Sequence, residues 1–446
     1  MVNALQQVAL VDTLLMNWDA IRLRMGPMSP ELAAKLTKLG QELGDAKSLS
    51  EAAKIVNELL DLTRHTPAEN YARELVARAS PGQMETTRGP GTFQAVNTDP
   101  EAMIEISKRA QESTASFGAL LSQTSALPMG VQAAPVFFAT NRRPGNPPRT
   151  TFSGDVGDSL SYGLALVTIP VAAHKIGKLE TPKWWKLYAE DQQESFLLND
   201  VSSLNQTEFG TKLGTAAQAS DSREILIFLH GYNVTFEEAA LRAAQFAYDS
   251  KFRGIVVLFS WPSQGSAFGY TGDEARAEAS GEKMAAFLRG LENGPWPKVH
   301  LLAHSMGNRV MLSGLADNPP QPTLPLGQLV FAAADVYVPV FNEKFPKLQN
   351  AGRLAATSYA SKKDRALWLS SILHNGARVG IVENVPYVID GLESIDASSV
   401  DKGLLGHGYW SDQRALITDL RSLLQQGLSP KERGLDQIGK YWAFPK

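Results

Sequence analysis

The hydrophobic and polar positions of this chain follow two different patterns on either side of residue 130. Before it, apolar residues recur at three- and four-residue spacing, which is typical of amphipathic helices. This spacing predicts a helix over residues 4–25 and a second from the Ser48-x-x-Glu51 cap signal to Leu60. Further helix starts near residues 66 and 100 indicate that the amino-terminal region is helical throughout.

After residue 130, short apolar runs alternate with helical stretches. Buried strands are expected at residues 160–169, near Phe196, and at 224–229, 255–259, 299–304, 328–333, 353–360 and 385–395; helices are expected after Phe196, at 236–248 and from 412. This alternation predicts an α/β fold with a doubly wound, mostly parallel sheet. We therefore expect two domains, a helical accessory domain at residues 1–126 and a catalytic α/β domain at residues 127–446, joined by the turn signal Leu127-Pro128-Met129-Gly130.

Ser305 is the candidate nucleophile of the α/β region. It follows the apolar run 299–304 and precedes a helical stretch, so strand, sharp turn and helix are predicted around it. Small residues at Ala303 and Gly307 let strand and helix approach closely. The alternative is an ordinary serine that caps a helix.

The strand predicted at residues 224–229 ends in His230-Gly231-Tyr232-Asn233. A glycine after such a strand permits a tight backbone path, and a serine nucleophile needs donors for the developing oxyanion. The backbone N–H groups of Tyr232 and Met306 are the expected donors. His230 is expected to brace this loop through hydrogen bonds.

A serine nucleophile also needs a base and an acid that orients the base. His407 lies in a Gly-His-Gly loop after the last predicted strand and is the candidate base. Asp364 follows the next-to-last strand and is the favoured acid; Asp335, after the strand before it, is the alternative. The chain order of serine, acid and histidine is that of an α/β-hydrolase.

Other polar and aromatic residues have less specific expectations. Trp261, Phe268 and His304 are candidates for the substrate pocket, although core or lid packing is an equal alternative for the aromatic residues. His174 is expected to be exposed. The basic, proline-rich segment 142–149 is expected to be a solvated hairpin connection, with phosphate or carboxylate binding as a minor alternative.

Five sequence blocks carry a resemblance to known proteins, at residues 137–142, 160–163, 228–233, 259–263 and 303–309. Together they resemble the α/β-hydrolase superfamily, and within it a bacterial group of largely uncharacterised serine esterases and lipases. The resemblance covers about residues 131–425. It implies the α/β-hydrolase fold, a serine nucleophile and acyl hydrolysis. The substrate we expect is a small-molecule or lipid ester. An amidase, peptidase or thioesterase with the same triad is one alternative, and a hydrolase-like binding protein is another.

Composition narrows the function classes further. The chain has 446 residues, no cysteine and a formal net charge of −3, and it contains no nucleotide-binding fingerprint, so neither nucleic acid nor a cofactor or metal is expected. No apolar run is long enough to span a membrane. Residues 1–15 do not resemble a signal peptide, which favours the cytoplasm; a secreted or periplasmic location is the alternative if a signal peptide has been removed. The amino-terminal helices are candidates for covering the site, docking a partner or forming a homo-oligomer.

Overall fold

The structure is a computed structural model of the whole chain. It describes residues 14, 29–45, 49–63, 127, 129–145, 151–180, 193–265, 270–319, 323–350, 355–364, 367, 376–401 and 414–445. The chain divides into two compact units, one of residues 1–98 with 266–271 and the other of residues 99–265 with 272–446. The predicted boundary between residues 126 and 127 remains a prediction.

Two helices of the first unit are described, α3 (Pro30–Asp45) and α4 (Leu49–Thr63). Leucines at three- and four-residue spacing, Leu36, Leu39 and Leu43, are buried in α3, and Val56 and Leu59 are buried in α4. The helix predicted from Ser48 to Leu60 is thus confirmed. The helices predicted at residues 4–25 and from residues 66 and 100 lie outside the described residues, apart from Leu14.

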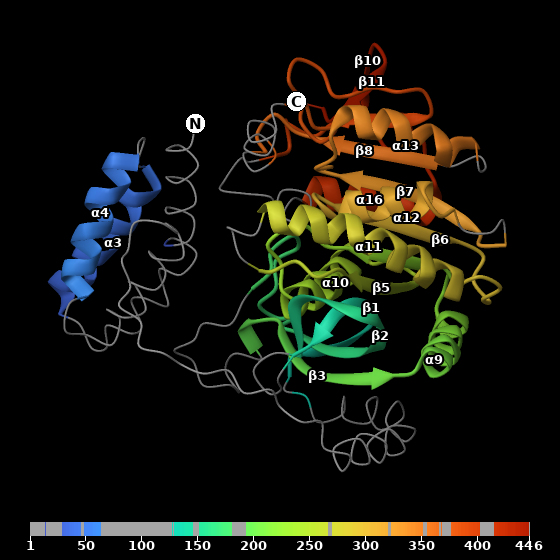
Figure 1. Cartoon of the computed structure of the whole chain (residues 1–446), viewed down its shortest axis with the longest axis horizontal. Helices are drawn as coiled ribbons and strands as arrows, with labels where there is room; N and C mark the ends of the chain where they lie inside the picture. Colours follow the sequence, from blue (N-terminus) through green and yellow to red (C-terminus); the bar gives the residue numbers. More distant parts are fainter. Residues whose placement is uncertain are drawn as a thin grey trace. The chain divides into compact units, whose positions relative to one another are not determined.

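The second unit is built on one sheet (Figure 1). Its strands are β1 (Gln132–Pro144), β2 (Phe152–Ile169), β3 (Leu197–Leu204), β4 (Ile225–Leu229), β5 (Ile255–Ser260), β6 (Val299–His304), β7 (Leu326–Ala332), β8 (Ala355–Ala360), β9 (Leu392–Asp396), β10 (Asp436–Ile438) and β11 (Tyr441–Ala443). They lie in the order β10-β11-β9-β8-β7-β6-β4-β5-β1-β2-β3. In this order, each neighbouring pair from β11 to β1 is parallel. At the two edges of the sheet, β10 pairs with β11, β2 with β1, and β3 with β2 in antiparallel fashion. The predicted mostly parallel α/β sheet is confirmed.

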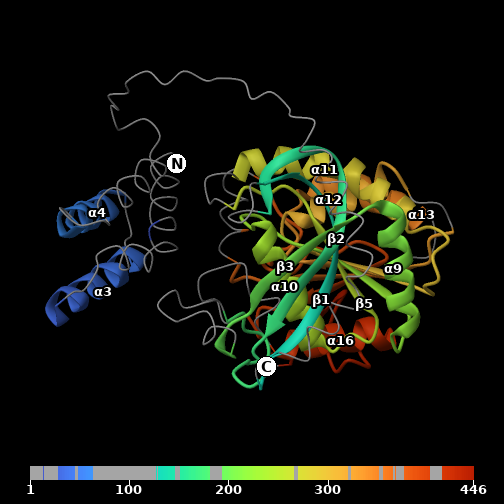
Figure 2. The ribbon, with the colours of Figure 1, turned by 90° about the horizontal axis from the view of Figure 1, so that it is seen from below.

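Alternating side chains of the strands pack on helices at the two faces of the sheet. The helices are α9 (Gln206–Ala219), α10 (Phe236–Ser250), α11 (Tyr270–Gly290), α12 (Gly307–Ala316), α13 (Val338–Asn350) and α16 (Arg414–Gln426). Phe138 and Phe228 contact phenylalanines of α10, whereas Phe137, Phe259 and Phe331 contact phenylalanines of α9, α11 and α13. Figure 2 shows the sheet between these two helix layers.

Two sequence predictions away from the candidate site are wrong. The last central strand starts at Leu392 rather than at residue 385, because Pro386 lacks an N–H group and Gly391, at φ +83°, forms a turn. The side chain of His174 is 2% exposed, because Glu180 and Asp249 enclose its imidazole on both sides. The residues next to His174 are typical of a turn, and its partner Asp249 lies 75 residues further along the chain, so the sequence does not indicate that the side chain is buried.

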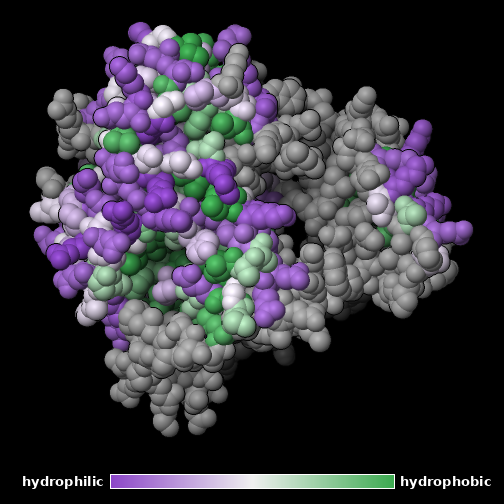
Figure 3. All heavy atoms as spheres, turned by 180° about the vertical axis from the view of Figure 1, so that it is seen from behind, coloured by the Kyte–Doolittle hydropathy of each residue, from purple (hydrophilic) through white to green (hydrophobic). Residues whose placement is uncertain are grey.

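The surface is chemically mixed. Figure 3 shows hydrophilic and hydrophobic residues interspersed over the visible face of the described part. Within the described ranges, no helix combines the length and the apolar character needed to cross a membrane.

Candidate active site

Ser305 and the two candidate acids follow strands that end at one edge of the sheet. Since β4, β6, β7 and β8 run in parallel, the residues that follow them, His230, Ser305, Ala333 and Ser361, come to the same carboxyl edge. Strand β4 lies between β5 and β6. After β4, the chain forms β5 on one side of it and then crosses back to form β6 on the other side. Ligands of open α/β sheets bind outside the carboxyl ends of the strands at such a switch point.

Ser305 adopts the strained turn that the sequence predicts. Its φ is +52°, a left-handed conformation that costs a non-glycine residue about 1–2 kcal/mol. The turn is held on both sides, because the Ser305 N–H donates to the carbonyl of Ala332 at 2.9 Å. The Ser305 carbonyl accepts from the side-chain amide of Asn308 at 2.9 Å and from the backbone N–H of Asp335 at 3.2 Å. The surrounding structure therefore fixes this conformation.

Two glycines allow the β4 loop to pack directly on this turn. A Cβ atom at Gly307 would lie 2.4 Å from the carbonyl oxygen of His230, and one at Gly231 would lie 2.7 Å from Nδ1 of His304 and 3.0 Å from Cβ of Ser305. Any larger residue would push the loop and the turn apart. Met306, the residue after the serine, is buried and lies just before α12, while Tyr232 is half-buried and follows Gly231.

The two candidate acids have different surroundings. The Asp335 carboxylate is fully buried, with Oδ1 at 3.3 Å from Nε of Arg378 and 3.9 Å from Nη2 of Arg309. Asp364 is 3% exposed, and its Oδ1 accepts from the N–H of Leu367 at 3.0 Å. Both follow strands of the parallel sheet, β7 and β8.

His407 and Phe268 lie outside the described residues. Trp261 is fully buried; its Nε1 donates to the carbonyl of His230 at 2.8 Å, and its ring stacks on the His230 imidazole with 5.2 Å between centroids. His304 is 7% exposed and lies against Gly231. Trp261 and His304 therefore both contact the loop after β4.

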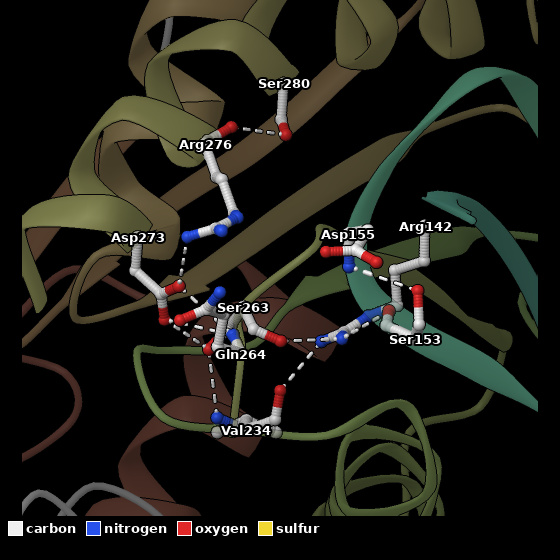
Figure 4. Close-up of polar contacts among 9 residues, drawn as sticks. All are labelled: Arg142, Ser153, Asp155, Val234, Ser263, Gln264, Asp273, Arg276 and Ser280. Carbon is white, nitrogen blue, oxygen red and sulfur yellow. Dashed lines mark hydrogen bonds and ion pairs between the residues drawn. The ribbon is translucent and has the colours of Figure 1, made fainter. Parts of the chain in front are cut away.

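The burial of Arg142 differs from the solvated connection that the sequence predicts for segment 142–149. Arg142 belongs to β1 and is 1% exposed. Figure 4 shows its guanidinium among loops from several elements. Its hydrogen bonds go to Oγ of Ser260 and to the carbonyls of Ser153, Ser263 and Val234, and Nη2 lies 3.3 Å from Nε2 of His230. The sequence signals are a charged residue at the end of an apolar run and the block 137–142, which ends at Arg142, but the following Arg143 and Pro144 are typical of a surface connection.

His230 braces its loop, as predicted. Its Nδ1 donates to the carbonyl of Gly231 at 2.8 Å, so Nε2 carries no proton in the neutral ring and faces Ser260 and Arg142 as an acceptor. Burial and the positive charge of Arg142 lower the pKa of His230 to about 3. Burial also lowers the pKa of Arg142 to about 10, against the opposing charges of Asp273, Glu237 and Glu238. At neutral pH the pair is thus a neutral imidazole beside a guanidinium cation.

The side chains of the described residues form no cluster of three or more histidines, cysteines and carboxylates that could hold a metal ion.

A family model described as alpha/beta hydrolase of unknown function (DUF900) matches residues 205–426, which run from just before α9 to the end of α16. This span includes Ser305, both candidate acids and His407. A search of curated proteins found no match. The parallel sheet, the serine turn after β6 and the family match agree, and the chain is a member of the α/β-hydrolase superfamily.

Proposed function

We propose that this protein is a serine hydrolase that cleaves carboxylic esters through an acyl-enzyme, with Ser305 as the nucleophile. The observation that carries the proposal is the turn at Ser305, which keeps a left-handed φ of +52° at the carboxyl edge of the central strand β6. A helix cap does not need this strain. A nucleophile does, because the sharp turn projects its hydroxyl away from the sheet.

His407 is the proposed base and Asp364 the proposed acid. The contacts of Asp335 support this choice, since its carboxylate is engaged by Arg378 and Arg309 and its backbone N–H holds the nucleophile turn. A carboxylate committed to guanidinium groups is a poor partner for an imidazole that must become positively charged. Asp335 then serves to hold the turn in place.

In the proposed reaction, His407 accepts the Ser305 proton while the hydroxyl oxygen attacks the ester carbonyl. The tetrahedral intermediate collapses to the acyl-enzyme when the histidine returns this proton to the leaving alcohol. Water, deprotonated by the same histidine, then attacks the acyl-enzyme carbonyl; the histidine returns this proton to Oγ of Ser305, and the carboxylic acid product leaves. The N–H groups of Tyr232 and Met306 stabilise the oxyanion in both halves; losing one such donor costs about 3 kcal/mol of barrier.

The first experiment measures hydrolysis of p-nitrophenyl esters from short to long acyl chains. The wild-type protein is compared with Ser305→Ala and with Ser203→Ala, a matched control because Ser203 is exposed on the edge strand β3. We expect turnover by the wild type and the control and none by Ser305→Ala, with all three folded. The preferred chain length then separates small-molecule from lipid esters.

Other results of this experiment would favour a different function. Hydrolysis of amides or thioesters in place of esters would indicate an amidase, peptidase or thioesterase. No turnover of any of these substrates would favour a hydrolase-like binding protein. For the acid, we expect Asp364→Asn to lower kcat by about 10⁴-fold through the wrong histidine tautomer. If Asp335→Asn shows this loss and Asp364→Asn has a kcat near that of the wild type, Asp335 is the acid of the triad and Asp364 is not.

A further inference from the structure

One buried cation contacts both ends of the loop after β4, residues 230–234, which we name the oxyanion loop. Nη2 of Arg142 donates to the carbonyl of Val234 at 2.7 Å and lies 3.3 Å from Nε2 of His230. Between these two contacts lie Gly231, Tyr232 and Asn233. The guanidinium therefore spans the segment whose Tyr232 amide is the proposed oxyanion donor.

The remaining donors of Arg142 fix it to neighbouring elements. Nε donates to Oγ of Ser260 at 2.9 Å, and Nη1 donates to the carbonyl of Ser263 at 2.7 Å. Ser263 also holds the oxyanion loop, because its Oγ accepts from the N–H of Val234 at 3.1 Å and donates to Asp273 at 2.6 Å. Figure 4 shows the contacts of Ser263 with Arg142, Val234 and Asp273. The carboxyl ends of β1, β4 and β5 are thereby joined through one side chain.

Arginine is suited to this place by its shape. A guanidinium carries five N–H donors in a fixed plane, whereas an ammonium group has three donors on a flexible stem. Each hydrogen-bond acceptor that Arg142 meets in the described part of the chain is a carbonyl, a hydroxyl or the neutral His230. The carboxylates of Asp273, Glu237 and Glu238 favour this charge but form no hydrogen bond with the guanidinium, and burying a cation without such a partner is costly. Hydrogen bonds that only held the loops together could come from a neutral side chain and would not require a buried cation.

We propose that Arg142 is a positioning residue that keeps the Tyr232 amide directed at the oxyanion throughout the reaction. The proposal rests on the proposed serine hydrolase function. Hydrogen bonds to the oxyanion strengthen as charge develops, so a displaced amide weakens binding of the transition state more than binding of the substrate. The expected result of removing Arg142 is a lower kcat with little change in KM.

Three variants test this role. Arg142→Met removes the charge and the donors, and Arg142→Lys keeps the charge with fewer donors. Arg143→Met is the matched control, since Arg143 is the next residue of β1 but its side chain is 63% exposed. We expect kcat to fall about 100-fold in Arg142→Met, a loss typical of a 1 Å misplacement, and about 10-fold in Arg142→Lys. The control should match the wild type.

A count of reactive sites separates positioning from loss of folded protein. A fluorophosphonate reacts covalently with the nucleophilic serine, and its end-point stoichiometry gives the number of competent sites. A merely structural Arg142 would lower this number and leave kcat per titrated site unchanged, which would overturn the proposal. Positioning predicts a lower kcat per titrated site, an unchanged KM, and weaker binding of a trifluoromethyl ketone, which forms a tetrahedral adduct in the same oxyanion site.

Failure of the proposed function would look different. If neither the wild type nor Arg143→Met hydrolyses any ester, amide or thioester, serine hydrolysis is refuted, and the role of Arg142 in it falls too. If both are active while Arg142→Met retains wild-type kcat per titrated site, only the role of Arg142 is refuted.

Discussion

Two histidines with buried side chains, His230 and His174, lie at opposite edges of the sheet and differ in charge: the first is neutral and the second is a cation. His230 follows β4 at the carboxyl edge, where it faces Arg142 and is neutral. His174 follows β2, whose last residue, Ile169, pairs with the first residue of β1 at the amino edge. It lies between two carboxylates, with Nδ1 at 2.7 Å from Glu180 and Nε2 at 2.6 Å from Asp249.

The two regions differ in the partners that surround the buried positive charge. Carboxylates only accept hydrogen bonds, so both nitrogens of His174 donate and the ring is an imidazolium. Burial opposes this charge, but the hydrogen bonds and charges of Asp249 and Glu180 outweigh it and raise the pKa above its usual value. The His174 cluster is thus a closed ion-pair network. Arg142, by contrast, leaves its charge unneutralised by any direct hydrogen-bond partner in the described residues, beside a site where negative charge is proposed to develop.

Breaking the His174 cluster should therefore affect stability and leave activity unchanged. The substitution Asp249→Asn removes a carboxylate whose side chain is 1% exposed and leaves the imidazolium with a single charged partner. We expect it to lower the free energy of unfolding by about 3–5 kcal/mol, as for other buried pairs that lose one member. Urea unfolding followed by tryptophan fluorescence measures the change. An unchanged midpoint, or a lower kcat per titrated site, would show that the His174 cluster does not act on stability alone.

The opposite response is expected at the carboxyl edge. Gly231→Ala places a Cβ 2.7 Å from Nδ1 of His304 and 3.0 Å from Cβ of Ser305, so the oxyanion loop must shift away from the nucleophile. We expect kcat per titrated site to fall about 100-fold, equivalent to about 3 kcal/mol of barrier. Gly210→Ala is the control, because no atom beyond its chain neighbours and the backbone of its own helix α9 lies within 4 Å of its Cβ position. Equal kcat values for the two variants would refute the close approach as a requirement.

The two histidines should also give stability opposite dependences on pH. The raised pKa of His174 means that the folded state holds an extra proton above the unfolded value of about 6.5, so its contribution is complete below that pH and is lost as pH rises through the folded pKa. For His230, with a pKa of about 3, the unfolded state holds the extra proton between about pH 3 and 6.5, so stability is lost as pH falls.

For His230 the slope approaches about 1.4 kcal/mol per pH unit between about pH 3 and 6.5, and for His174 the slope has the opposite sign above about pH 6.5. Unfolding free energies of the wild type, His174→Gln and His230→Gln, measured from about pH 4 to about pH 9, separate the two contributions. Compared with the wild type, His174→Gln should be flatter on the alkaline side and His230→Gln flatter on the acid side. A variant that changes the other side instead would show that the charge assignment is reversed.

Much of the scaffold of the site was predictable from local sequence. The apolar runs before His230 and Ser305 are continuous because their strands are buried on both faces, and Gly231 and Gly307 mark the close approach of loop and helix. These signals depend on neighbours within a few residues. They therefore fixed the strands β4 and β6 and the serine turn correctly.

The roles of Arg142 and His174 were not predictable in this way. Arg142 finds its acceptors on β5 and on the oxyanion loop, and His174 finds Asp249 on α10, all distant in the chain. Arg142 stands next to Arg143 and Pro144, and His174 follows Pro170 and the short residues 171–173, so each position is typical of a surface turn. Only the folded sheet brings the partners that allow these charges to be buried.

The smallest expected effect tests whether burial sets the strength of the His174 cluster. The side chain of Glu180 is 13% exposed, compared with 1% for Asp249, and in Glu180→Gln the amide oxygen can still accept from Nδ1 of His174. We expect a loss of about 1 kcal/mol, because a partly hydrated charge contributes less than a buried one. Urea unfolding beside Asp249→Asn provides the comparison. A Glu180→Gln loss as large as that of Asp249→Asn would mean that both carboxylates contribute equally, whatever their exposure.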